Sequence, residues 1–321
     1  MLDRETLQTS SWMGDLPTSL TKVPLSCLAI PGSHDSGTFC LHPEEGVAVD
    51  QSDAIRRIVT CCCGLGKSVI HKWSQTQTLD FIGQLDKGVR YLDLRVCGKP
   101  ESADLYFVHG LYGQRVSDGL RDIERFLHLH PQEIILLDFN HFYNMTPDDH
   151  TILLNEIKDI FGAKLAEYNP YLSLWKLTLE HFWRTPQRLI IFYHNPMWNS
   201  VNFTWPSELI PSPWANVSST SSLVQFHEHN YFGHTRSDNG AFYVWQGVLT
   251  PSTATVAGHL FSSVKDRLAH KATRAFLSWL GDKVPSHIGI NICISDFVED
   301  EDFTTEVILL NNKVQYREIR L

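Results

Sequence analysis

The sequence predicts an α/β fold in one domain, a distorted (β/α)8 barrel of the TIM type, and three observations predict it. Short apolar segments alternate with amphipathic segments, as in the βαβ units that build a parallel sheet. The length of 321 residues suits one large barrel. Polar side chains follow the apolar segments, where a barrel strand carries its catalytic groups. We expect residues 1–24 to pack on the barrel and residues 25–321 to form it.

The first half of the chain shows strand-like and helical segments in turn. An apolar run at residues 28–30 ends in a Pro31-Gly32 turn, and Lys87-Gly88 is a helix stop after the first amphipathic segment. In order, we expect a strand at residues 28–30, a helix at 79–85, strands at 89–96 and 105–109, and a helix at 116–129 that Pro131 closes.

The second half continues the same alternation. Residues 133–140 are the clearest strand, because they are apolar on both faces as in a buried parallel sheet. Residues 195–240 are rich in Pro, Ser and Asn and are expected to form long loops. The remaining expectations are a helix at 151–164, a strand at 188–193, strands at 242–248 and 288–297, and a helix at 262–280. The chain then has seven strands with room for an eighth.

Composition excludes several classes of protein. The formal net charge of −9 disfavours a nucleic-acid partner, because a surface that follows phosphates is normally basic. No apolar stretch approaches the ~20 residues of a transmembrane segment, and residues 1–5 lack the apolar core of a signal peptide. Seven cysteines without repeated spacing indicate reduced thiols, so we expect a cytoplasmic protein, with a nuclear pool compatible. The Cys61-Cys62-Cys63 run is left without a role.

Three strand ends carry the side chains that indicate chemistry. His34 and Asp35 follow the first strand, Asp93 and Arg95 share a face of the next by alternation, and His109 ends the third. An acid, a base and a fixed cation suit proton-shuttled attack at a phosphate. The polar residues at predicted strand ends are His34, Arg95, His109, Asp138, Asn140, Tyr193, His194, Gln246 and Asp296.

Several motifs, in their order, resemble the X-domain of phosphatidylinositol-specific phospholipase C, and above all the animal proteins named for that domain. The motifs are Pro31-Gly32-Ser33-His34-Asp35-Ser36, Arg90-Tyr91-Leu92-Asp93-Leu94-Arg95, Phe107-Val108-His109-Gly110, Leu137-Asp138-Phe139-Asn140-His141-Phe142-Tyr143, Pro213-Trp214-Ala215-Asn216 and Ser295-Asp296-Phe297-Val298. The resemblance begins at Trp12 and extends over nearly the whole chain. It implies a distorted barrel that touches a membrane surface peripherally and cleaves phosphatidylinositol to diacylglycerol and an inositol phosphate, the cyclic form first.

The resemblance also implies roles for residues. His34 would be the general base toward the inositol 2-hydroxyl, and His109 the general acid toward the leaving glycerol oxygen. Asp296 would orient His34, and Asp35 would pair with His109. The residues expected to bind substrate are Asp93, Asp138, Asn140 and Tyr193.

No metal or other cofactor is expected. The calcium-dependent relatives carry an asparagine after the first histidine and two acidic ligands on the second strand, whereas this chain has Asp35 and then Asp93 with Arg95. A guanidinium cannot coordinate Ca²⁺, but it can stabilise charge on a phosphoryl group. The alternative for Arg95 is a structural ion pair with Asp93. A ring with additional phosphates would need several basic side chains nearby, and the motifs supply Arg95 alone for that purpose, so unphosphorylated phosphatidylinositol is the expected substrate.

Two other functions stay open on the sequence. A glycerophosphodiesterase-like barrel would need a carboxylate metal cluster, which Arg95 disfavours. A catalytically weak phosphoinositide-binding or regulatory barrel would not need the full set of histidines and acids. For membrane contact, Trp198, Phe203, Trp205 and Trp214 are candidate interfacial anchors, with packing onto the barrel as the alternative.

Overall fold

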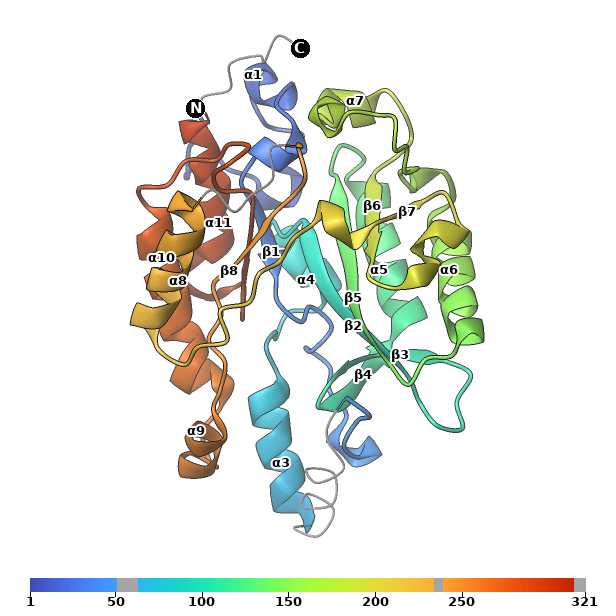
Figure 1. Cartoon of the computed structure of the whole chain (residues 1–321), viewed down its shortest axis with the longest axis vertical. Helices are drawn as coiled ribbons and strands as arrows, with labels where there is room; N and C mark the ends of the chain where they lie inside the picture. The colour runs from blue at the N-terminus through green and yellow to red at the C-terminus, as the bar shows by residue number, and fades with distance from the viewer. Residues whose placement is uncertain (51–62, 234–238, 315–321) are drawn as a thin grey trace.

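Nine strands form one curled sheet in the described part of the chain, and seven of them run parallel (Figure 1). The computed structural model describes residues 1–50, 63–233 and 239–314. Along the sheet the parallel strands are β7 (Thr204–Trp205), β6 (Leu189–Tyr193), β5 (Ile135–Tyr143), β2 (Tyr91–Gly98), β1 (Ile30–Ser33), β9 (Ile292–Ser295) and β8 (Val244–Gln246). The predicted distorted barrel is confirmed, with seven parallel strands in the described ranges rather than eight.

The two ends of this curved sheet, β7 and β8, approach each other through neighbouring backbone. The amide of Phe242 donates to the carbonyl of Leu209, and the amide of Val244 donates to that of Pro211, both at 2.9 Å. These bonds join the segment after β7 to the start of β8. The distortion of the barrel is therefore concentrated at this seam.

The strand that ends in His109 does not join the parallel set. β3 (Leu105–His109) pairs antiparallel with β2 and, across a tight turn, with β4 (Leu111–Arg115). A parallel partner would need a crossover of a dozen or more residues, whereas only residues 99–104 separate β2 from β3. Gly110 makes the turn possible with φ of 71°, in the region that favours glycine. The predicted strand is confirmed, but its parallel direction was wrong.

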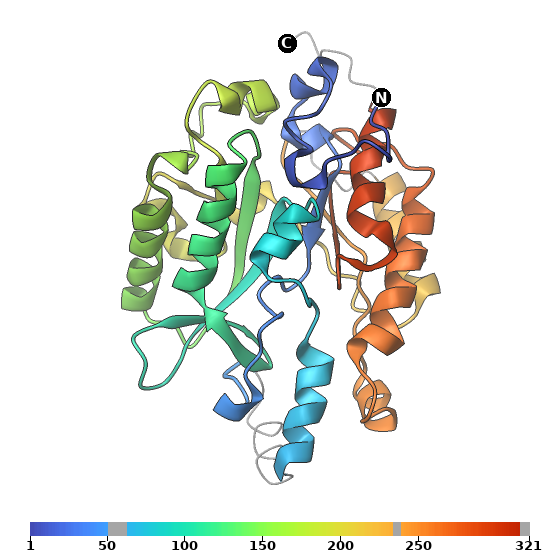
Figure 2. The same cartoon turned by 180° about the vertical axis from the view of Figure 1, so that it is seen from behind.

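Helices cover the outer face of the sheet (Figures 1 and 2). α5 (Val116–Leu129) has the predicted bounds, and α6 (Pro147–Phe161) begins earlier than predicted because Thr146 and Asp149 form a capping box. A π-helical turn, Lys265–Ala269, precedes α10. Further helices are α1 (Thr18–Thr21), α4 (Phe81–Asp86), α7 (Leu179–Trp183), α8 (Thr220–Phe232), α10 (His270–Leu280) and α11 (Phe303–Leu309). The expectation of long loops at residues 195–240 was wrong for α8.

Alternation along each strand divides the core into two layers. Leu92 and Leu137 belong to the layer beneath the outer helices, whereas Tyr91 and Leu136 belong to the layer inside the curve of the sheet. The same alternation aims the polar residues near the carboxyl ends of β2 and β5 inward. The inner layer thus leads directly into the polar end of the barrel.

The N-terminal segment contacts the amino ends of the strands. The indole of Trp12 donates to the carbonyl of Gly88 at 2.9 Å, and the amide of Gly14 donates to Glu133 at 2.9 Å. Glu133 also forms an ion pair with Arg90 at 2.7 Å, and both side chains are at most 1% exposed. A buried pair of charges thus lies between this segment and the sheet.

Two helices extend beyond the carboxyl ends of the strands (Figures 1 and 2). They are α3 (Cys63–Ser74) and α9 (Thr253–Gly258). Cys61 and Cys62 lie outside the described residues, and Cys63 begins α3. Within the described ranges, every helix is too short or too polar to cross a bilayer.

Candidate active site

The carboxyl ends of β1, β2, β5 and β9 open into a cavity of about 1390 Å³. One wall is polar and the other is formed largely by α3 and the segment around α9. The predicted residues that the structure brings together here are His34, Asp35, Asp93, Arg95, His109, Asp138, Asn140 and Asp296, and the polar wall also includes His141, His194 and Gln246.

His34 is held by a carboxylate from the far end of the chain. Its Nδ1 lies 2.7 Å from Oδ1 of Asp296, so Nε2 faces the cavity. Burial alone would lower the pKa of His34, but the negative charges of Asp35 and Asp296 outweigh it and raise the pKa to about 9. This arrangement stabilises the imidazolium that forms when His34 accepts a proton.

Asp35 lies between three cationic or basic groups. It forms an ion pair with Nε of Arg95, and its Oδ2 lies 3.5 Å from Nε2 of His34 and 3.4 Å from Nε2 of His109. Burial would raise the pKa of Asp35, but Arg95 and His109 outweigh it and hold the pKa far below its usual range. Asp35 is therefore a permanent carboxylate at the centre of the site.

His109 has a fixed ring orientation. Its Nδ1 lies 2.7 Å from the carbonyl of Ser74, and a carbonyl can only accept, so Nδ1 carries a proton. Nε2 then faces Asp35, and it can donate there when the ring is protonated. This is the geometry of a general acid whose charged form has a partner at each nitrogen.

Arg95 places a fixed cation beside both catalytic candidates. Its Nη2 lies 3.5 Å from Nε2 of His34, while its Nε pairs with Asp35. Burial would lower the pKa of Arg95, but Asp35 and Asp93 raise it above its ordinary value. The guanidinium therefore stays charged at any working pH.

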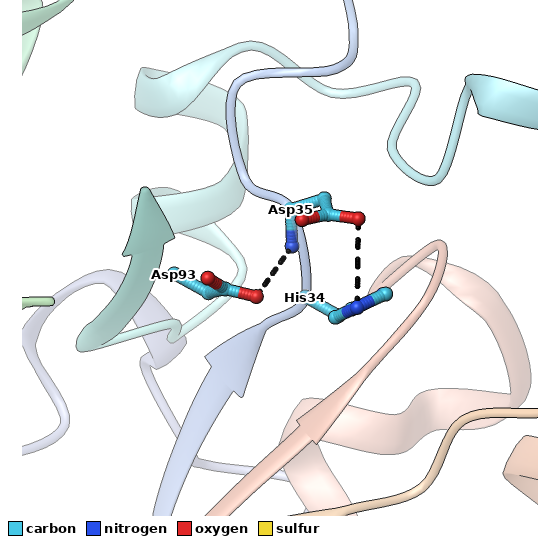
Figure 3. A group of neighbouring side chains, drawn as sticks. All are labelled: His34, Asp35 and Asp93. Carbon is cyan, nitrogen blue, oxygen red and sulfur yellow. Dashed lines mark hydrogen bonds and ion pairs between the residues drawn. The ribbon is translucent and has the colours of Figure 1, made fainter. Parts of the chain in front are cut away.

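Asp93 holds the backbone of the turn at His34 and Asp35 (Figure 3). Its Oδ2 accepts the backbone amide of Asp35 at 3.0 Å, and its Oδ1 accepts from Asn140 at 2.5 Å. The bond to Asp35 matters because that residue has φ of 43°, a left-handed conformation uncommon outside glycine. The expectation that Asp93 binds substrate stays a prediction, and its contacts add a role in holding the turn.

Asp138 and His194 form a second polar pair on the same wall. Oδ1 of Asp138 lies 2.8 Å from Nε2 of His194, and its Oδ2 accepts from the hydroxyl of Tyr91 at 2.6 Å. Burial would lower the pKa of His194, but its contact with Asp138 raises the pKa above the usual value. The pair presents an oriented imidazole to the cavity.

Tyr193 lies away from the cavity, which corrects the expectation that it binds substrate. Its side chain is fully buried among outer-layer residues, and its hydroxyl lies 2.6 Å from Nδ1 of His150 in α6. Side chains alternate along β6, so Tyr193 lies on the same face as Ile191, toward the outer helices. His194, the next residue, turns into the cavity instead.

Three side chains of the site could approach a metal ion. His34, Asp35 and Asp93 each offer one ligand atom, and these atoms lie within 4.8 Å of one another. However, Asp35 already neutralises Arg95, and a protonated His34 has no free lone pair for a metal. A divalent cation here would lie beside a guanidinium, so the charge distribution favours the arginine in the cation's place.

The opposite wall of the cavity is apolar. Val69, Ile70 and Trp73 of α3 face it, together with Leu249 and Leu260. Among the candidate anchors, Trp214 lines the cavity and is 56% exposed.

The other candidate anchors pack onto the barrel. Phe203 and Trp205 are at most 4% exposed, and Trp198 packs against the outer core. For these three, packing onto the barrel, the alternative stated from the sequence, is what the structure shows.

Residues 74–77, between α3 and α4, hold the catalytic turns together, and no motif marked them in the sequence. The carbonyl of Ser74 holds His109, and the side chain of Gln77 bonds to the backbone of His34. His141 was also missed as a cavity residue, although it follows Asn140 directly and its Nδ1 lies 2.7 Å from Oδ1 of Asn140. Only the folded contacts reveal these roles.

Comparison with known proteins gives close relatives over nearly the whole chain. The chain is 44% identical to mouse PI-PLC X domain-containing protein 2 over 310 residues, covering 96% of this chain and 89% of the relative. It is 38% identical to human PI-PLC X domain-containing protein 3, covering 95% and 94%, and 31% identical to human PI-PLC X domain-containing protein 1, covering 94% and 92%. No protein-family model matches the chain.

Two bacterial enzymes have solved structures with the same fold. The phosphatidylinositol-specific phospholipase C from Listeria monocytogenes superposes with a TM-score of 0.63 at 21% identity, covering 95% of this chain and 99% of that one. A mutant of the corresponding enzyme from Staphylococcus aureus superposes with a TM-score of 0.67 at 17% identity, covering 98% and 100%. These similarities confirm the barrel fold.

Proposed function

This chain belongs to the family of PI-PLC X domain-containing proteins, and on that premise we propose that it is a metal-independent phosphatidylinositol-specific phospholipase C. It cleaves phosphatidylinositol to diacylglycerol and an inositol phosphate. One observation carries the proposal. His34, backed by Asp296, and His109, backed by the carbonyl of Ser74, both face the ion pair of Asp35 and Arg95.

The first proton transfer uses the neutral form of His34. Its Nε2 takes the proton of the inositol 2-hydroxyl, whose oxygen forms a bond to phosphorus. The resulting imidazolium lies against the carboxylates of Asp296 and Asp35, which stabilise it. A positioned proton transfer of this kind contributes about 10²–10⁴-fold to the rate.

The second proton transfer uses the charged form of His109. As the bond between phosphorus and the glycerol oxygen breaks, Nε2 of His109 gives its proton to that oxygen, and diacylglycerol leaves. Oδ2 of Asp35 lies 3.4 Å from this nitrogen. The products are diacylglycerol and a cyclic inositol phosphate, which water can open by the reverse roles.

Arg95 supplies the positive charge for the phosphoryl oxygens. Asp35 and Asp93 keep it charged and fix its position, so it needs no reorganisation as negative charge develops. This is the chemistry that a calcium ion would otherwise provide. The proposed reaction therefore needs no metal ion.

The polar wall suits an unphosphorylated inositol ring. Oriented groups of Asp138, Asn140 and His194 can donate to and accept from ring hydroxyls. Five carboxylates, those of Asp35, Asp93, Asp138, Glu208 and Asp296, line the cavity, and among its lining residues Arg95 is the fixed cation. Additional ring phosphates would be repelled by this wall.

The apolar wall suits the lipid part of the substrate. It continues from the catalytic residues to α3 and the segment around α9, which extend beyond the barrel. A diacylglycerol moiety could leave the bilayer along this wall while the headgroup reaches the polar side. The contact with the membrane is accordingly peripheral and transient.

The test is product analysis with matched histidine variants. Phosphatidylinositol vesicles are incubated with the protein, and phosphorus NMR follows the cyclic product. His34→Gln and His109→Gln should each abolish product formation, whereas His128→Gln, exposed on α5, should retain it. Retained turnover in both site variants would overturn the roles of these two histidines. An inactive wild-type protein that still binds vesicles would leave the regulatory barrel as the better description.

A further inference from the structure

The end of α3 and the connection that follows it, residues 74–77, contact three of the strand ends that carry the site. The carbonyl of Ser74 accepts from His109, and the hydroxyl of Thr76 donates to the carbonyl of His34 at 3.2 Å. The carbonyl of Thr76 accepts the amide of Phe297 at 2.7 Å. Residues 74–77 thus touch the strand ends of β1, β3 and β9.

Gln77 makes the most specific of these connections. Its side chain is fully buried, and Nε2 donates to the carbonyls of His34 at 2.9 Å and Ser295 at 3.0 Å. Its Oε1 accepts the amide of Val298 at 3.2 Å. One amide group therefore joins the backbone at His34 to the backbone on both sides of Asp296.

The two turns that Gln77 joins are conformationally unusual. Asp35, directly after His34, has φ of 43°, and Phe297, directly after Asp296, has φ of 47°. Left-handed backbone at non-glycine residues persists only where surrounding contacts determine it. The bonds of Gln77 to Ser295 and Val298 flank Phe297 and so hold one of these turns in place.

We propose that Gln77 is the positioning residue that aligns Asp296 with His34 for proton transfer. This inference rests on the proposed function for its kinetic consequence, whereas its structural consequence is independent of activity. Gln77 contacts backbone on both sides of the pair, so its loss lets the carboxylate of Asp296 and the ring of His34 separate. Substrate binding is untouched because Gln77 does not line the cavity.

The chemistry of the side chain explains why glutamine stands here. The site uses two N–H donors and one oxygen acceptor at a fixed reach from the backbone. An ionised glutamate of the same shape cannot donate to the two carbonyls, and methionine of similar volume makes none of the three bonds. Replacement should therefore disturb alignment even where packing is kept.

The test compares Gln77→Met with Gln84→Met. Gln84 is also fully buried and also donates to two carbonyls, those of Ser36 and Leu79, but these bonds do not reach β9. The ring NMR signals of His34 are titrated in both variants, and kcat and KM are measured on phosphatidylinositol vesicles. Thermal unfolding of both variants reports the general cost of losing a buried amide.

We expect Gln77→Met to lower the pKa of His34 from about 9 toward its ordinary value, because Asp296 no longer stabilises the imidazolium. Above pH 9, where the ring of His34 is neutral in both proteins, a misalignment on the ångström scale reduces kcat by up to about 10²-fold while KM stays unchanged. Gln84→Met should keep the pKa of His34. Equal changes in the two variants, or an unchanged pKa in Gln77→Met, would overturn the proposal.

The readouts separate this inference from the proposed function. A wild-type protein without lipase activity whose His34 pKa still falls in Gln77→Met would refute the function and support the positioning role. An active wild type whose Gln77→Met variant keeps the wild-type pKa of His34 and the wild-type kcat would support the function and refute the positioning role. If Gln77→Met does not fold, Gln77→Asn, which keeps an amide and adds no charge but is one methylene too short to reach all three backbone partners, carries the same titration.

Discussion

Asp296 lies 2.7 Å from His34 although 262 residues separate them in the sequence. β1 and β9 are parallel neighbours, and Ser33 is paired in register with Ser295. The residue that follows each partner therefore emerges at the same height of the sheet. Strand register thus brings the general-base candidate beside its carboxylate, and Gln77 joins the two turns that carry them.

Replacing that carboxylate by an amide tests the role of the pair. Asp296→Asn should lower the pKa of His34. Above pH 9, where the ring is neutral in both proteins, it should reduce kcat by about 10²- to 10⁴-fold, because the imidazolium that forms during the reaction loses its stabilising charge. Steady-state kinetics on phosphatidylinositol vesicles measures the effect. Asp282→Asn, at an exposed site, is the control and should change neither the pKa of His34 nor kcat.

The pH dependence follows from the raised pKa of His34. With a pKa of about 9, the free protein carries the imidazolium at pH 7, and only the neutral ring can act as a base. Each pH unit below 9 therefore reduces the reactive fraction about tenfold, so kcat/KM should rise from pH 6 to 9. A profile that falls over this range would contradict the assignment of His34 as the base.

Arg95 is predicted to be irreplaceable by lysine. Arg95→Lys keeps one positive charge but loses the planar donors that contact Asp35 and approach His34. We expect kcat to fall by about 10²- to 10³-fold, as for loss of one preorganised donor to a developing charge. Steady-state kinetics with chelator and with added calcium measures the fall in kcat. Recovery of kcat by the variant when calcium is added would indicate a metal site instead.

The buried ion pair beneath the barrel is predicted to carry stability. Arg90→Met leaves Glu133 charged and buried without its partner, which should cost about 3–5 kcal/mol of unfolding free energy in a denaturant titration. The double variant Arg90→Met/Glu133→Leu should recover part of the loss. Arg121→Ala, in an exposed pair with Asp118, should change stability by less than about 1 kcal/mol.

His227 is predicted to limit stability in acid. It is buried against Trp245 and Trp279, and burial lowers its pKa to about 4, although Nε2 lies 3.1 Å from the carbonyl of Gln246. Because the unfolded chain binds this proton near pH 6.5, stability is full above that value and decreases as pH falls to 4. The decrease amounts to about 3 kcal/mol.

His227→Phe is the variant for this comparison. The difference in unfolding free energy between wild type and variant should shift by that amount from pH 7 to pH 4. Urea titrations at both pH values measure it. An equal difference at the two pH values would show that His227 is not the titrating group.

Strand alternation was enough to predict most of the cavity. Asp138 and Asn140 share a face of β5 because successive side chains alternate, and both line the site. The same rule applied past the end of β6 would have placed His194 inside and Tyr193 outside. The end of β6 was located correctly, but which of its side chains face the outer helices was not determined.

Other features depend on contacts that no local pattern encodes. The direction of β3 follows from the short connection after β2, and its histidine reaches the site because Ser74 orients the ring. Gln77 lies in a polar connection of ordinary composition, so its bonds to two distant strand ends become visible only in the fold. Sequence motifs identify the reacting groups better than the residues that position them.

The most direct test of the metal-independent phospholipase is the release of water-soluble inositol phosphate from phosphatidylinositol vesicles, measured in excess EGTA and again with added Ca²⁺. Because Arg95 occupies the place of a cation beside Asp35, the account predicts the same rate in both conditions. Release that requires Ca²⁺, or no release in either condition from a folded protein, would contradict it.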